Sequence, residues 1–199
     1  MRTRRLVTLA LVAVTVLAGC SDGDPAAPVS SAPRAIKDLD PASMSLVRVE
    51  FCDLVPVAAV RTALGSEPRT PDEWRNGDPI PGGGPGGIGH EFGCSWTSPA
   101  GRIARAWVFA RPIAPAYART LVRAAGRKTG CTTTASAFGE PGLLQSCSGP
   151  GKSLVARHAG LFQDTWLSCE VTQTSTRKAV TARADAWCSA VASALDTSK

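Results

Sequence analysis

Residues 91–111, EFGCSWTSPAGRIARAWVFAR, contain two runs of alternating apolar residues on either side of a Pro-Ala-Gly connection. An alternation with a period of two is typical of half-buried strands, and a short connection that contains Gly is typical of a hairpin. We therefore predict strands at 91–98 and 102–111, joined by a turn at 99–101. Antiparallel pairing is thus the starting point for the fold.

Strand patterns return after Cys131, and helical patterns lie before, between and after the strands. Further strands are predicted near 131–136, 142–148, 153–159 and 161–172, with a short one at 46–50 and a long loop at 66–90. Helices are predicted at about 56–64, 115–126 and 176–195, from apolar residues at helical spacing and from Pro or Gly at the ends. This order of elements predicts an α+β fold, in which an antiparallel sheet carries helices packed on one face.

The first twenty residues have the pattern of an export signal. Three arginines precede an uncharged apolar run from Leu6 to Ala18, which is shorter than a spanning helix needs. The run ends in Leu-Ala-Gly-Cys, which is typical of a bacterial lipobox, so we predict cleavage before Cys20 and a diacylglyceryl group on its thiol. Two acyl chains give stable membrane anchoring. The alternative is an ordinary signal peptide with a cysteine nearby.

These patterns divide the chain into three parts. Residues 1–19 are the predicted lipoprotein signal peptide, and residues 20–45, rich in Pro, Ser, Ala and Asp, are a predicted disordered tether. Residues 46–199 form a predicted single domain. The expected location is the extracytoplasmic face of the cell membrane, with the lipid anchor as the membrane contact.

Six cysteines remain once Cys20 is set aside, and an oxidising compartment favours disulfides between them. Fifteen pairings can be drawn. The expected positions on strands and helices favour three of these bonds, because a cysteine on the buried stripe of the last helix can reach a core-facing cysteine on a neighbouring strand. The predicted pairs are Cys52–Cys94, Cys131–Cys147 and Cys169–Cys188.

No cofactor or metal is predicted. The sequence has no C-x-x-C pair, and only His90 and His158 could assist a zinc site. The stretch GGGPGG at 82–87 matches a dinucleotide-binding pattern in letters, but no strand precedes it and no helix opens from it.

The formal charge of +6 falls to +3 when the three arginines of the signal peptide are removed. We interpret this surplus as spread along the chain. Together with the export signal it argues against a nucleic-acid partner, and it leaves room for weak attraction to an anionic envelope.

Catalytic patterns are weak. A hydrolytic triad needs a nucleophile, a histidine and an acid, but no G-x-S-x-G is present. The candidate carboxylate pairs Asp72 with Glu73 and Asp164 with Glu170 fit solvated faces. We therefore predict that the protein is not an enzyme, and keep an envelope hydrolase that uses His90 and His158 as an alternative.

Trp74 lies in the polar stretch PDEWRNGD. Aromatic side chains in such a position are typical of partner contacts. Trp74 is therefore a candidate contact for a partner or ligand, and folding back onto the domain is the alternative.

The segments FCDLVPVAAVRTALG (51–65), GCSW (93–96) and AWCSAV (186–191), behind a lipobox, resemble actinobacterial lipoproteins grouped as a domain of unknown function. The resemblance covers about 46–196, has no established activity to transfer, and does not account for Cys131 and Cys147. The extracellular sensor domain of some bacterial kinases is similar in its disulfides and implies a binding domain. We expect a non-catalytic binding, sensor or accessory module that contacts an envelope protein or a small ligand, with a carrier of an apolar ligand or lipid as the alternative.

Overall fold

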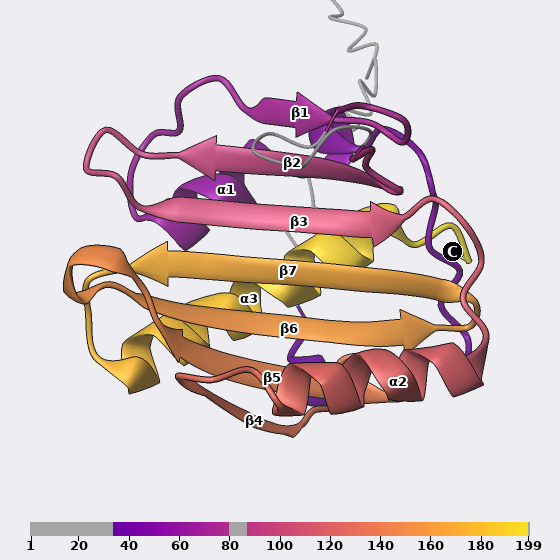
Figure 1. The fold of residues 1–199 in the computed structure, drawn as a ribbon. Helices are drawn as coiled ribbons and strands as arrows, with labels where there is room; N and C mark the ends of the chain where they lie inside the picture. Colours follow the sequence, from indigo (N-terminus) through magenta and orange to yellow (C-terminus); the bar gives the residue numbers. More distant parts are fainter. Residues whose placement is uncertain (1–33, 80–86, 199) are drawn as a thin grey trace, which may run out of the picture. The chain divides into compact units, whose positions relative to one another are not determined.

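The computed structural model describes residues 34–79 and 87–198, which form a seven-stranded antiparallel sheet with three α-helices (Figure 1). The strands are β1 (Asp72–Trp74), β2 (Glu91–Thr97), β3 (Ile103–Phe109), β4 (Cys131–Ala135), β5 (Gly142–Ser148), β6 (Leu154–Phe162) and β7 (Thr165–Gln173). The helices are α1 (Val57–Leu64), α2 (Pro115–Gly126) and α3 (Arg177–Leu195). The predicted α+β class with an antiparallel sheet is confirmed. The signal peptide, Cys20 and most of GGGPGG lie outside the described residues.

The strands lie in the order β1-β2-β3-β7-β6-β5-β4. The β2–β3 hairpin forms as predicted, and β7 completes the middle of the sheet by pairing with both β3 and β6. The predicted boundary between the strands at 153–159 and 161–172 was wrong. β6 continues to Phe162, and the turn falls at Gln163 and Asp164, where Gln163 adopts a φ of 52°.

The helices cover both faces of the sheet, which corrects the expectation that they all pack on one face. α1 and α3 lie behind the sheet in Figure 1, over a core that includes Leu167 and Trp187. α2 lies on the opposite face, where Ala118 packs with Leu143, Leu161 and Trp166 in a second cluster. The alternation of side chains along β6 and β7 supplies apolar residues to both clusters, because successive residues of a strand point to opposite faces.

All three predicted disulfides are present, with sulfur–sulfur distances of 1.95–2.07 Å. One bond joins the segment before α1 to β2, one joins the edge strand β4 to its neighbour β5, and one joins β7 to α3. The six cysteines that follow Cys20 are therefore all paired. This arrangement fits a protein that folds outside a reducing cytoplasm.

The domain begins earlier than the predicted boundary at residue 46. Leu39 and Met44 are buried in the main core, and the side chain of Ser189 on α3 donates a hydrogen bond to the Arg34 carbonyl. Residues 34–45 therefore pack on the domain, although they lie within the predicted tether of 20–45. Two buried apolar side chains in an otherwise polar stretch supply the packing energy.

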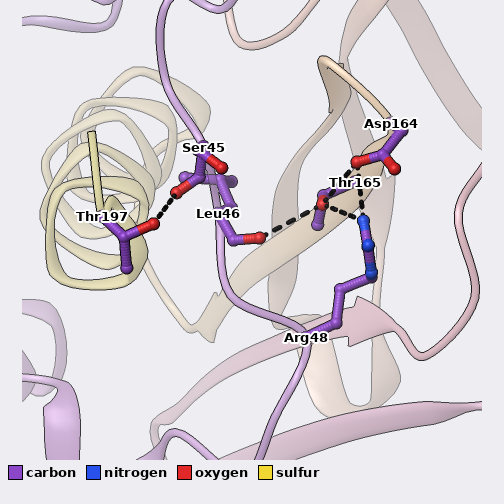
Figure 2. A network of polar contacts seen from close by, with 6 residues as sticks. All are labelled: Ser45, Leu46, Arg48, Asp164, Thr165 and Thr197. Carbon is purple, nitrogen blue, oxygen red and sulfur yellow. Dashed lines mark hydrogen bonds and ion pairs between the residues drawn. The ribbon is translucent and has the colours of Figure 1, made fainter.

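Polar contacts hold residues 45–48 to the β6–β7 turn and to the chain after α3 (Figure 2). Arg48 Nη1 donates to Asp164 Oδ1 at 2.6 Å and to Thr165 Oγ1 at 2.8 Å. The Thr165 hydroxyl donates to the Leu46 carbonyl at 3.2 Å, and the Thr197 hydroxyl donates to the Ser45 carbonyl at 3.0 Å. The strand predicted at 46–50 is reduced to one bridge between Leu46 and Asp196.

The loop predicted at 66–90 contains the edge strand β1, which pairs with β2. Three residues, Asp72–Trp74, form this strand, and its two acidic side chains are exposed. Such a short, charged strand is a common way to end a sheet without inviting further strand pairing.

Candidate functional site: a pocket beside a buried histidine

An open pocket of about 620 Å³ lies where the N-terminal segment meets α3 and the end of β4. Its volume is within the range of small-molecule sites in proteins. Five of its lining residues are alanine or isoleucine and five carry polar or charged side chains. They are Arg34, Ala35, Ile36, Lys37, Ser136, Ala137, His158, Ala182, Asp185 and Ala186, and we call this the His158 pocket.

His158 lies on β6, and its side chain points toward α3. Only 3% of it is exposed, and both ring nitrogens have partners. Nδ1 lies 3.0 Å from Ser136 Oγ, and Nε2 lies 2.7 Å from Asp185 Oδ1. The imidazole therefore joins three separate parts of the chain: the residue after β4, the strand β6 and the helix α3.

In a neutral imidazole one ring nitrogen donates a hydrogen bond and the other accepts one. An ionised carboxylate only accepts hydrogen bonds, so with Asp185 ionised the proton of a neutral His158 lies on Nε2 and Nδ1 accepts from the Ser136 hydroxyl. Ser136 Oγ in turn accepts from the backbone N–H of Phe138 at 3.1 Å, and the Phe138 ring lies 5.6 Å from the imidazole. Every polar atom of the histidine is thus satisfied, and this wall of the pocket is preorganised.

The rim of the pocket carries charge of both signs. Arg34 and Lys37 are exposed, and neither forms an ion pair with any residue that the structure describes. Asp185 has 48% of its side chain exposed, although it contacts His158. Two unpaired cations beside small apolar side chains favour a ligand with an anionic group and a compact apolar part.

Trp74 does not stand free of the domain. It is half-buried in β1, and its ring lies over Gly93, where a built Cβ would approach Trp74 Cζ2 to 2.0 Å. Its Nε1 donates to Glu91 Oε1 at 3.0 Å. Burial raises the pKa of Glu91, and the hydrogen bond from Trp74 partly opposes that rise. The structure thus places Trp74 against the sheet, as the alternative interpretation expected.

The other candidates do not come together. His90 is exposed, and nothing joins it to His158. Asp164 pairs with Arg48, whereas Glu170 lies 3.6 Å from Arg105 on the neighbouring strand. The two acids of the second candidate pair, Asp72 and Glu73, both lie exposed on β1.

Comparison with family models, with curated proteins and with solved structures found no match to this chain. Among the described residues, no helix is long and apolar enough to cross a membrane. Within the same parts of the chain, no group of three or more His, Cys, Asp or Glu residues is placed to hold a metal ion. The class of protein is therefore inferred from the disulfide-bonded α+β domain, and the candidate site from its pocket.

Proposed function

We propose that this protein is a lipid-anchored, extracytoplasmic binding module of the cell envelope, whose His158 pocket takes a small anionic ligand. The proposal agrees with the expected binding, sensor or accessory role and with the resemblance to actinobacterial lipoproteins. The observation that carries it is the pocket itself, which combines a preorganised polar wall with two cations that form no ion pair within residues 34–79 and 87–198.

The location is supported by the cysteines. Three disulfides use every cysteine after residue 20, and this leaves Cys20 as the single thiol, at the end of the apolar leader. An odd cysteine in an exported chain needs a separate purpose, and thioether linkage to a diacylglyceryl group supplies one.

The lining distinguishes between classes of ligand. A carrier of a purely apolar molecule would need a wall of large apolar side chains, whereas this pocket has small ones and a rim with Arg34, Lys37 and Asp185. A molecule with a carboxylate or phosphate and a short apolar part matches both features. The cations meet the anion, and the alanines contact the remainder.

Native mass spectrometry of the protein extracted from membranes tests the proposal. We expect a diacylglyceryl mass on the peptide that begins at Cys20, and a non-covalent adduct on the intact domain. Ala186→Trp fills the pocket and is expected to abolish the adduct, while Lys37→Gln weakens binding up to about fivefold, the equivalent of roughly 1 kcal/mol.

The matched control is Lys178→Gln, which removes one exposed cation from the start of α3, outside the pocket lining. It should leave the adduct unchanged. An adduct that persists in Ala186→Trp would show that the ligand binds elsewhere. An unmodified Cys20 would contradict the proposed lipid anchor.

One observation favours a second candidate, the envelope hydrolase. Ser136, His158 and Asp185 form a hydrogen-bonded series of the types found in hydrolytic triads. In such a role Ser136 Oγ would attack an ester carbonyl and pass its proton through Nδ1 to the departing alcohol, and water would then release the acyl group. The ring nitrogens are reversed, however, because the common arrangement places the acid on Nδ1 and the serine on Nε2.

A fluorophosphonate probe separates the two candidates. We expect Ser136 to remain unlabelled, because its Oγ already accepts the Phe138 N–H and Nδ1 belongs to an imidazole held on both sides. Peptide mapping measures the result, with a known serine hydrolase as the positive control. A probe adduct on Ser136, absent in Ser136→Ala, would instead establish the hydrolase.

A further inference from the structure

The net positive charge of the domain comes from one segment and is not spread along the chain, which corrects the interpretation of the sequence. Residues 111–139 contain five Lys or Arg and no Asp or Glu. The rest of residues 34–199 contains fourteen Lys or Arg and fourteen Asp or Glu. The whole surplus of the domain therefore lies in and around α2. The five cations are Arg111, Arg119, Arg123, Arg127 and Lys128.

We call these five cations, which lie on α2 and in the segments that flank it, the α2 face. All five residues are exposed, and none pairs with an acid among the described residues. Helix α2 lies on the front of the sheet in Figure 1. Ala118, Leu121 and Val122 pack in the second cluster, so the polar side of the helix faces away from the sheet.

The α2 face brings like charges close together. Arg119, Arg123 and Arg127 follow one another at intervals of four residues, which brings like charges together on one side of a helix. No acidic residue in the segment offsets this repulsion. Arg127 Nε donates to the Arg123 carbonyl at the end of the helix, and an anionic surface facing these side chains would relieve the repulsion between them.

We propose that the α2 face docks the domain onto the anionic phospholipid surface of the membrane that holds its anchor. This inference takes its membrane from the proposed function. A basic amphipathic helix is typical of membrane-surface contact, and each cation near an anionic bilayer contributes about 1 kcal/mol. Tyr117 on the same helix has 52% of its surface exposed and is suited to the interface.

The length of the tether allows the domain to contact the membrane. Thirteen residues lie between Cys20 and Arg34, and even fully extended this stretch reaches at most about 50 Å. A domain of this size has a radius of gyration of about 15 Å, so the anchor keeps every side of it within reach of the bilayer. The tether does not determine which side of the domain faces the bilayer. We infer that side from the uneven distribution of charge.

Vesicle co-sedimentation tests the α2 face apart from the anchor. The chain from residue 20 on is used with Cys20→Ser, because residues 34–198 contain the described sheet, its core and all three disulfides. We expect binding to vesicles of phosphatidylcholine mixed with phosphatidylglycerol, loss of binding at high salt, and little binding to phosphatidylcholine alone. The triple variant R119Q/R123Q/R127Q should partition about a hundredfold less, from roughly 1 kcal/mol per cation.

The matched control removes the same charge elsewhere. R69Q/R177Q/K178Q neutralises three exposed cations outside the segment 111–139 and should keep most of the binding. Equal losses in the two triple variants would overturn the inference, because net charge alone would then explain the binding. Equal binding to neutral and mixed vesicles would also overturn it. Lipidation of Cys20 is measured separately by peptide mass, so a failed anchor and a failed α2 face give different results.

Discussion

Replacing both Cys169 and Cys188 with alanine is expected to lower the free energy of unfolding by about 4–5 kcal/mol. The bond closes a sequence separation of 19 residues, for which the chain-entropy account gives about 3 kcal/mol. Both cysteines are fully buried between β7 and α3, so removing two sulfurs also leaves a cavity that costs about 1 kcal/mol or more. Urea unfolding of the oxidised proteins measures the change.

The edge disulfide provides the matched comparison. Cys131 and Cys147 close a similar separation of 16 residues between β4 and β5, but Cys131 is only half-buried. Replacing this pair with alanine should lower the free energy of unfolding by about 3 kcal/mol, which is close to the contribution of loop-closure entropy alone. If the two double variants lose the same stability, burial of the central bond contributes nothing, and our explanation is wrong.

Local patterns predicted most of the sheet. The β2–β3 hairpin needs only alternation and a short turn, and both are visible within 21 residues. The pairing of Cys169 with Cys188 followed because both cysteines could be placed on elements whose buried side was readable from their neighbours. The last helix is the clearest case, since Cys188 lies on the same stripe as Trp187 and Val191.

Local patterns could not predict on which face of the sheet α2 packs. Periodicity shows which side of the helix is apolar, but both faces of the sheet offer apolar partners. The choice depends on the connection from β3, in the middle of the sheet, across to β4 at its edge. That path is a property of the strand order, which alternation along single strands does not reveal.

The pocket was also beyond local reasoning. The sequence identified His158 as a candidate, but its partners Ser136 and Asp185 are 22 and 27 residues away in sequence. Asp185 lies on a helix position that the pattern assigns only to a polar side. Residues 34–37 also line the pocket, and their composition predicts no packing on the domain. The segregated charge of residues 111–139, by contrast, was countable from the sequence.

Truncation of Trp187 is expected to produce a loss comparable to that of the central disulfide. Trp187 is 1% exposed at the centre of α3, and its ring meets Trp96 edge-on with centroids 5.3 Å apart. Its Nε1 donates to the Arg105 carbonyl of β3 at 2.9 Å. Trp187→Ala removes the ring and the hydrogen bond together, so we expect a loss of about 3–5 kcal/mol in urea unfolding.

Two further variants separate packing from hydrogen bonding at this position. Trp187→Phe keeps an aromatic ring against Trp96 but leaves the Arg105 carbonyl without this donor, for an expected loss of about 1–3 kcal/mol. Trp107→Ala, on the opposite face of β3 and only half-buried, should cost less than Trp187→Ala. If Trp107→Ala were the more damaging, burial and the hydrogen bond to Arg105 would not explain the contribution of Trp187.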